Sequence, residues 1–186
     1  MKIIRINPKN PEKEIIAKVA GALKKGKVVV YPTDTVYGLG ANALDEKAVE
    51  KVFEIKKRNF KKPISIIVRD IEMARKVASF GKDVENILEK ILPGPVTIIL
   101  YKKKILPDIL TGGSKKIGLR IPECKFTKAL MKKLDFPITA TSANISGKSI
   151  KGRPSTVIDL TGPKPKILRV GAVTKKELSK ILCIDF

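Results

Sequence analysis

Residues 28–40, VVVYPTDTVYGLG, join an apolar run to a polar corner, and this junction decides how the chain is interpreted. The run VVVY is typical of a buried strand, because β-branched and aromatic residues favour strands. Two hydroxyls and a carboxylate follow at once in Pro-Thr-Asp-Thr. Such residues serve in turns and helix caps, but they also bind ligands where the strands of an α/β sheet end. The junction therefore predicts a strand whose polar end forms either a turn or a binding site.

The whole chain has 186 residues, of which 43% are hydrophobic and 31% are charged. This composition predicts a single folded domain over residues 1–186, without internal repeats or a low-complexity linker. Apolar runs stay below the roughly 18 to 20 residues that span a bilayer, and the apolar stretch near the N-terminus is too short for a signal peptide. We therefore expect a cytoplasmic protein without membrane contact.

Histidine is absent, and the two cysteines, Cys124 and Cys183, lie far apart without zinc-type spacing. The chain thus lacks the commonest general base and most transition-metal ligands, so no metal site of its own is expected. Any chemistry must depend on the positioning of substrates and on charge.

The formal net charge is +21, and 32 of the 39 basic residues are lysines scattered along the chain. Such a surface can be the solvated exterior of a thermophile's protein, or it can bind a polyanion such as nucleic acid. Both explanations stay open at this point. The seven arginines are therefore more informative than the lysines.

Strand patterns alternate with helix patterns, which predicts an α/β domain with ligands at strand ends. Asn10 is expected to cap the first helix and Gly26 to end it. In the second helix Ala48, Val52 and Ile55 recur at helical spacing and should face the core. Residues 92–103 should be a Pro-Gly-Pro turn that leads into a strand, and residues 136–147 a strand that breaks into a polar loop. One or two helices are expected at about 71–91. The other expected strands cover residues 2–6, 27–32, 62–68, 116–122, 155–162 and 166–173, and the other expected helices cover residues 10–26, 45–58, 125–135 and 174–182.

Arginine interrupts two apolar strands, as Arg120 in IGLRIP and Arg169 in ILRV. A buried guanidinium costs several kcal/mol unless it is paired, so each should face an acidic partner or an anionic ligand. We favour a ligand, because the planar fork of donors matches phosphate or carboxylate. Arg58 and Lys62 of KKRNFKKP would add positive charge beside the hydroxyl-rich strand ends. Since neither GxxxxGK[ST] nor GxGxxG occurs, the residues alone indicate an anion-binding α/β domain related to nucleotides.

Seven motifs follow one another along the chain: YPTDTVYGLGANA, KKRNFKKPISIIV, LPGPVTIIL, IGLRIPE, TSANISG, PSTVIDL and ILRVGAV. Together they resemble the threonylcarbamoyl-AMP synthase family, the YrdC-like proteins, over about residues 28–173. The resemblance implies a twisted mixed sheet with helices, curved around a large basic concave cavity. It also implies that L-threonine, bicarbonate (or carbon dioxide) and ATP, which carries Mg²⁺, yield threonylcarbamoyl-adenylate and pyrophosphate. A partner complex would then transfer the threonylcarbamoyl group to adenosine at position 37 of certain tRNAs.

The site residues implied by the resemblance fall into three groups. The catalytic group, which clamps phosphate, is Lys56, Arg58 and Lys62. The L-threonine group is Thr35, Arg120 and Ser155, with Arg120 as the partner of the threonine carboxylate. The ATP group is Arg58, Lys62, Ser142, Asn144 and Arg169.

The chain departs from the family pattern in three places. Many relatives carry histidine where Cys124 and Ile67 stand here. Between Gly147 and PSTVIDL only KSIKGR remains of a usually longer segment, so the wall of the threonine pocket is expected to be rebuilt there. The chain also ends soon after ILRVGAV, which is typical of the short form without the extra C-terminal domain.

A non-catalytic module that binds double-stranded RNA or tRNA through phosphates is the main alternative, because the chain is so basic. The aromatic content of 5%, without tryptophan, disfavours a platform that stacks single-stranded bases. A third alternative is a carbamoyl-transfer domain related to the hydrogenase-maturation branch, whose members are usually much larger. A pure RNA binder would ignore threonine, and the third class would respond to carbamoyl phosphate.

Overall fold

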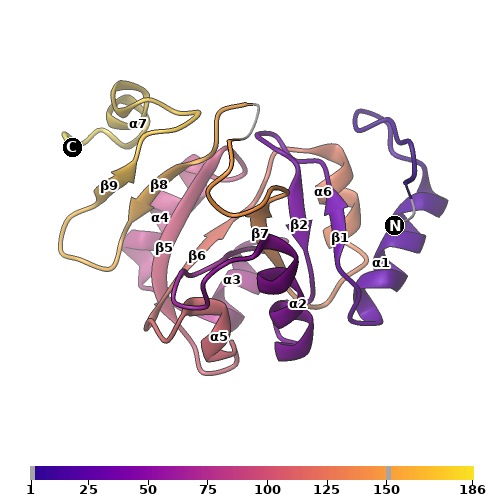
Figure 1. The fold of residues 1–186 in the computed structure, drawn as a ribbon. Coiled ribbons are helices and arrows are strands. Elements are labelled where there is room, and N and C mark those ends of the chain that lie inside the picture. Colours follow the sequence, from indigo (N-terminus) through magenta and orange to yellow (C-terminus); the bar gives the residue numbers. More distant parts are fainter. Residues whose placement is uncertain (1–2, 150–151) are drawn as a thin grey trace.

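The structure is a computed structural model that describes residues 3–149 and 152–186. Its centre is a mixed nine-stranded sheet in the order β1-β2-β7-β3-β6-β5-β8-β9, with β4 paired to β5 (Figure 1). The parallel pairs are β3 with β6 and β5 with β8, and the other neighbours are antiparallel. The strands are β1 (Val29–Tyr31), β2 (Gly38–Gly40), β3 (Ser65–Ile67), β4 (Ala78–Ser79), β5 (Val96–Lys102), β6 (Lys116–Arg120), β7 (Ile138–Ser142), β8 (Thr156–Asp159) and β9 (Lys166–Arg169).

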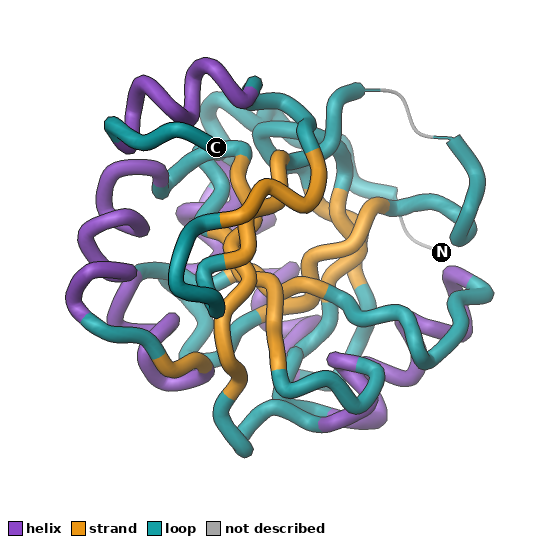
Figure 2. Tube along the Cα trace, turned by 90° about the vertical axis from the view of Figure 1, so that its left-hand side faces the viewer, coloured by secondary structure: helices purple, strands orange, loops and turns teal. Residues whose placement is uncertain are grey.

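Seven helices accompany the sheet within the described ranges, and Figure 2 shows the strands at the centre with helices around them. Capping groups begin several of them: the Asp45 carboxylate accepts from the Ala48 N–H at 3.2 Å, and Thr174 forms a capping box with Glu177. The α/β class expected from the alternating patterns is thereby confirmed. The helices are α1 (Lys13–Lys24), α2 (Glu46–Lys56), α3 (Ile71–Val77), α4 (Lys82–Ile91), α5 (Asp108–Thr111), α6 (Lys125–Met131) and α7 (Lys175–Leu182).

The N-terminal expectations were wrong in two respects. Residues 3–6 form no strand, and α1 begins at Lys13 with Glu12 rather than Asn10 at its N-cap. Asn10 instead closes a turn in which its N–H donates to the Asn7 carbonyl at 3.2 Å. Gly26 does follow the helix, with a φ of 65° that suits glycine.

Burial also differs from the expected pattern in two elements. Ile55 is 52% exposed while the next residue, Lys56, is buried, so the inner face of α2 is rotated from the one expected. Val30 is 56% exposed because β1 lies at the edge of the sheet and pairs with β2 alone. The run at 27–32 is therefore an edge strand, only partly buried.

The strand β2, which the sequence patterns did not predict, is formed by glycine on either side of Leu39. The buried Tyr31 ring lies over both glycines, so a Cβ atom at Gly38 or Gly40 would come within 2.6 Å of that ring. Burial raises the pKa of the Tyr31 phenol, which donates to the Thr139 carbonyl at 2.9 Å. This packing joins β1 to β2 and fixes the polar corner between them.

Gly171, in the loop after β9, packs directly on the segment that precedes β8. A Cβ atom there would lie 2.2 Å from the Pro154 carbonyl oxygen, which is backbone and has little room to shift. We expect Gly171→Ala to lower the free energy of unfolding by about 2–4 kcal/mol. Urea denaturation followed by circular dichroism measures this, and Gly81→Ala is the control because its Cβ would meet nothing within 4 Å. Equal stability of the two variants would contradict the packing described.

No helix in the described ranges is long and apolar enough to cross a membrane.

Candidate functional site

The corner at residues 32–35 uses its hydroxyls in two different ways. Thr33 Oγ1 donates to the Val36 carbonyl at 2.7 Å and accepts from the Thr35 N–H at 3.1 Å, which closes a local turn. Thr35 Oγ1 instead accepts from Arg120 Nη1 at 3.0 Å. One hydroxyl therefore shapes the corner, and the other meets the arginine of a distant strand.

Arg120 lies at the end of β6 and is 7% exposed, as its position in an apolar strand predicted. Its Nη2 pairs with the Asp34 carboxylate, and its Nη1 binds Thr35. The Nε atom is buried and has no hydrogen-bond partner among the residues that the structure describes. Of the two expected kinds of partner, the structure shows the acidic one, and Nε is the nitrogen of the guanidinium that is left without a partner in the described residues.

Arg169 was expected on a buried strand, and that expectation was wrong. The strand β9 lies at the edge of the sheet, and Leu168 is 53% exposed. The guanidinium folds back on Ser155, with Nη2 at 2.8 Å and Nε at 3.2 Å from the Ser155 carbonyl oxygen. Burial of the guanidinium, and then the positive charge of Arg120, lower the pKa of Arg169. The positive charge of Arg120 is thus close enough to disfavour a second charge at Arg169.

Ser155 is 7% exposed, and its Oγ lies 2.7 Å from Thr97 Oγ1 and 3.3 Å from Arg169 Nη2. It thus connects β5 to the arginine of β9. Part of the shortened segment before it, at residues 150–151, lies outside the described residues.

Lys56, at the end of α2, supports the Ser-Ala-Asn loop from inside. Its Nζ donates to the Ser142 carbonyl, to the Asn144 carbonyl at 2.6 Å and to Asn144 Oδ1 at 3.1 Å. The Lys56 carbonyl in turn accepts from the Ser146 N–H at 2.8 Å. Burial, and then the charge of Arg58, lower the pKa of Lys56 to about 8. Three oxygens of the loop therefore surround this one ammonium, which brings the predicted Lys56, Ser142 and Asn144 together.

Arg58 and Lys62 lie in the segment between α2 and β3. Lys57 ends the helix in the left-handed conformation, with a φ of 48°, and so turns the chain away from the helix axis. Arg58 closes the segment by donating through Nε to the Lys62 carbonyl at 3.1 Å and through Nη2 to the Pro63 carbonyl at 2.9 Å. Burial lowers the pKa of Arg58. The Lys62 ammonium is exposed and unpaired within the described ranges, so it is available to an anion.

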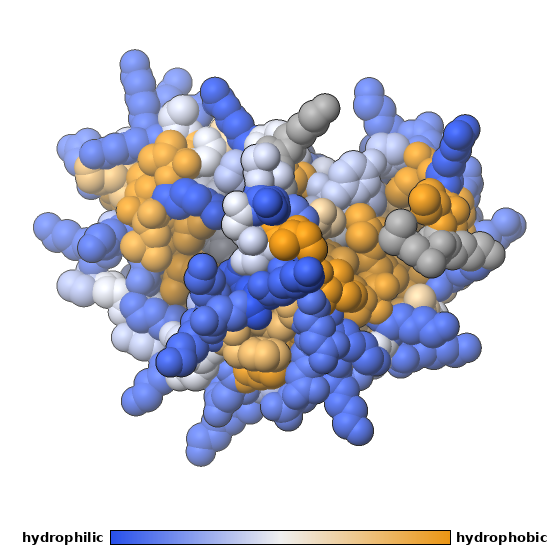
Figure 3. Space-filling view, in the orientation of Figure 1, coloured by the Kyte–Doolittle hydropathy of each residue, from blue (hydrophilic) through white to orange (hydrophobic). Residues whose placement is uncertain are grey.

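The corner and the Ser-Ala-Asn loop are neighbours, because β2 pairs with β7. Gly38 lies opposite Ser142 in this pairing, and the Ala143 N–H donates to the Tyr37 carbonyl at 2.9 Å. Figure 3 shows hydrophilic side chains gathered at the centre of this face, with apolar surface on either side. The Ser-Ala-Asn loop thus lies beside the start of β2, whereas Arg120 is level with the opposite end of β7, because its register partner Ile67 lies opposite Ile138. The corner connects the two, since Thr35 binds Arg120.

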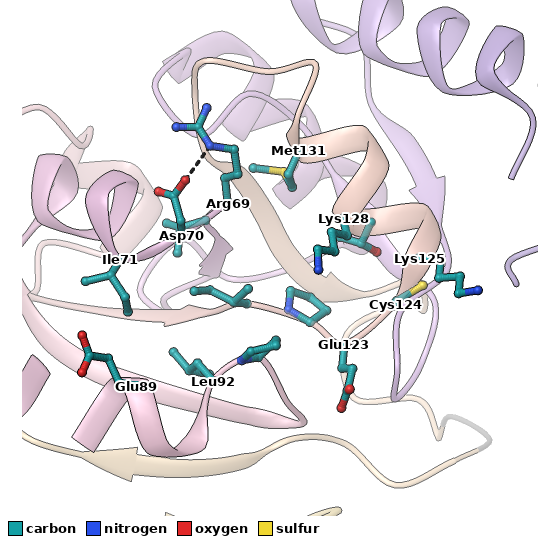
Figure 4. A pocket seen from close by; sticks show the side chains of 15 residues that line it. Arg69, Asp70, Ile71, Glu89, Leu92, Glu123, Cys124, Lys125, Lys128 and Met131 are labelled. Atoms are coloured by element: carbon teal, nitrogen blue, oxygen red, sulfur yellow. Dashed lines mark hydrogen bonds and ion pairs between the residues drawn. The ribbon is translucent and has the colours of Figure 1, made fainter. Parts of the chain in front are cut away.

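A pocket of about 800 Å³ lies beyond the carboxyl ends of β3 and β6 and next to α6 (Figure 4), and its wall includes Ile121, which follows Arg120. Its walls include none of the predicted site residues. Three acidic and three basic side chains line it, so their formal charges cancel. It is therefore not the large basic cavity expected from the resemblance, which stays a prediction. Its wall does support the corner: Thr127 Oγ1 donates to the Pro32 carbonyl at 2.8 Å, and the Cys124 thiol lies 3.8 Å from the same oxygen.

The remaining departures from the family pattern are structural positions here. Ile67 is fully buried in β3 opposite Arg120, and Cys124 is the half-buried N-cap residue of α6. No group of three or more potential metal ligands of the His, Cys, Asp and Glu types occurs in residues 3–149 and 152–186. Asp34, the partner of Arg120, was not among the predicted site residues, although it stands between two threonines of the same corner.

Two sequence comparisons identify relatives. The family Sua5_yciO_yrdC, described as Telomere recombination, matches residues 21–152, more than half of the chain. A relative from Methanocaldococcus jannaschii, provisionally named a threonylcarbamoyl-AMP synthase, is 44% identical over 162 residues, which cover 86% of this chain and 74% of the relative.

Two solved structures share the fold. Pyrococcus abyssi Sua5 complexed with L-threonine has a TM-score of 0.91 at 34% identity; the match covers 97% of this chain but only 61% of that longer one. Escherichia coli YciO has a TM-score of 0.84 at 27% identity, and the match covers 93% of this chain and 97% of that one. On the family match, the identities and the shared fold, the chain belongs to the Sua5_yciO_yrdC family.

Proposed function

We propose that the protein is a threonylcarbamoyl-AMP synthase, which converts L-threonine, bicarbonate or carbon dioxide, and Mg²⁺-bound ATP into threonylcarbamoyl-adenylate and pyrophosphate. The observation that carries the proposal is the buried Arg120 beside the Thr35 hydroxyl, with its Nε N–H unpaired in the described structure. A guanidinium in this setting is suited to the carboxylate of an amino acid. The likeness to a structure complexed with L-threonine, at 34% identity, supports the same assignment.

The proposed reaction requires neither a nucleophile nor a general base from the chain, which fits the absence of histidine. The neutral amine of threonine adds to carbon dioxide and loses a proton to solvent water, which forms a carbamate. A carbamate oxygen then attacks the α-phosphorus of ATP, the bond from that phosphorus to the bridging oxygen breaks, and pyrophosphate leaves. Such a step gains most from alignment and from neutralised charge.

The cationic residues of the segment after α2 would stabilise the phosphates. Lys62 is exposed and unpaired among the described residues, and the Nη1 group of Arg58 makes no hydrogen bond within the same ranges. Ser142 and Asn144 would contact the nucleotide from the loop that Lys56 supports, so Lys56 would act mainly by holding that loop. Arg169 and Ser155 would line the region between the threonine and the phosphates.

The product is proposed to serve a tRNA threonylcarbamoyl-transfer complex in the cytoplasm, where the group would be passed to adenosine. Direct contact with tRNA or double-stranded RNA would be favoured by the net charge of +21.

Pyrophosphate release tests the proposed function. The purified chain is incubated with ATP and Mg²⁺, with and without L-threonine and bicarbonate, in buffer freed of carbon dioxide. We expect release only when both co-substrates are present, with the adenylate identified by mass spectrometry. Release that ignores threonine, or none from folded protein, would contradict the proposal; binding of RNA that falls steeply with salt would then favour the RNA-binding module.

A further inference from the structure

We infer that Asp34 is a positioning residue for Arg120: its carboxylate holds the guanidinium in one orientation, which fixes the direction of the N–H groups left for an incoming carboxylate, the unpartnered one on Nε among them. What Arg120 receives rests on the proposed function. How Arg120 is held is a property of the protein without substrate, and can be tested separately.

Both oxygens of Asp34 are used by the segment that leaves β6. Oδ1 accepts from Arg120 Nη2, and Oδ2 accepts from the Glu123 N–H at 3.1 Å. The side chains of Asp34 and Arg120 are 11% and 8% exposed, so water has little access to the pair. Glu123 lies just before α6 (Figure 4), which Thr127 ties to the corner. The carboxylate therefore has a fixed place of its own, from which it can fix Arg120.

The guanidinium is held at both ends by the same corner. Asp34 binds Nη2 and Thr35 binds Nη1 at 3.0 Å, so the plane of the guanidinium cannot rotate without breaking one of these contacts. The direction of the Nε N–H is fixed with the plane. A buried donor without a partner is unfavourable and rare in folded proteins, and a ligand that completes it is one explanation.

Charge explains why the carboxylate is needed. Arg169, which is held on Ser155, and Arg120 are both positively charged, and the two guanidinium groups repel each other. Asp34 is the carboxylate paired with Arg120 in the described structure, so it offsets one of these two positive charges. One net positive charge remains, which matches a single carboxylate. Without Asp34, repulsion by Arg169 would favour displacement of Arg120 from the corner.

The orientation of Arg120 can be read by nuclear magnetic resonance. In ¹⁵N-labelled full-length protein the Arg120 Nε–H signal, assigned with Arg120→Lys, should exchange slowly with solvent. In Asp34→Asn we expect exchange at least tenfold faster. The matched control is Asp159→Asn, which removes a partly exposed ion pair, with Lys116 at 2.9 Å, on β8; it should leave the signal unchanged. Equal protection of Arg120 in Asp34→Asn and the wild type would overturn the inference.

Kinetics separates positioning from a role in folding alone. We expect Asp34→Asn to raise the KM for L-threonine at least tenfold, while the KM for ATP stays within about twofold. An unchanged KM for threonine in folded Asp34→Asn would overturn the inference. A wild-type protein that does not use threonine would instead overturn the proposed function, and the hydrogen-exchange measurement alone would then test the role of Asp34. If Asp34→Asn does not fold, Thr35→Val releases the other end of the guanidinium, and retained protection of Nε–H in that variant would contradict the two-ended hold.

Discussion

Arg58→Ala is expected to reduce threonine-dependent pyrophosphate release by a factor of about 100 to 1,000, which is the usual loss when one charge-stabilising donor is removed from an active site. The residue lies between the loop that Lys56 supports and the exposed Lys62, where the triphosphate is proposed to bind. Positive charge there would stabilise the charge that develops as pyrophosphate leaves. Initial rates at saturating ATP and threonine measure the effect.

Two companion variants distinguish chemistry from folding. Arg58 also donates to the carbonyls of Lys62 and Pro63, so Arg58→Ala should lose about 1–2 kcal/mol of stability, which urea denaturation can measure. Arg58→Lys keeps the charge but not the planar fork, and should fall between the wild type and alanine in rate. Lys61→Ala removes a nearby exposed lysine and should retain full activity. Wild-type turnover by folded Arg58→Ala would remove Arg58 from the site.

Elements with strong local signals could be predicted from the sequence, and those formed by distant packing could not. The helix after Asp45 and the helix after Thr174 carry their own caps, and both begin where expected. The strand β2 has no such signal, because Gly-Leu-Gly is a poor strand former and depends on the Tyr31 ring that covers it. At the N-terminus a local signal was misleading: residues 3–6 have the composition of a strand, but in the described structure no neighbouring strand pairs with them.

The candidate site shows the same division. Arg120 could be singled out because a charge within an apolar run is costly, but its partner Asp34 lies 86 residues away and only the fold brings them together. Arg169 has apolar neighbours as well, yet these are exposed because β9 is an edge strand. In α2 an amphipathic pattern placed Ile55 inside, whereas Lys56 is inside because the oxygens of the Ser-Ala-Asn loop require a donor.

This role of Lys56 leads to a second large effect, on the use of ATP. Lys56→Met keeps most of the side-chain volume but leaves the Ser142 and Asn144 oxygens without the ammonium that now binds them. Each buried acceptor left unsatisfied costs about 1–3 kcal/mol, so the loop should leave its present position. We expect the KM for ATP to rise by a factor of about 10 to 100. Lys51→Met, an exposed lysine on the same helix, should change it little.

The dependence on pH gives the sharper test, because the pKa of Lys56 is about 8 in the folded protein and 10.5 in the reference state. Above pH 8 the folded protein increasingly carries a neutral amine, which has two N–H donors for three oxygens, so affinity for ATP should fall as the pH rises through about 8. The free energy of unfolding should change with pH in the opposite direction to the affinity for ATP. Between the two pKa values Lys56 binds more protons in the unfolded chain than in the folded protein, so its contribution to the free energy of unfolding rises with pH. Lys56→Met should abolish both trends while Lys51→Met keeps them. A second comparison decides whether Lys56 supports the loop or binds phosphate directly. If it supports the loop, Lys56→Met should weaken the binding of ATP and of AMP by the same factor. If it binds phosphate directly, Lys56→Met should weaken the binding of ATP far more than that of AMP.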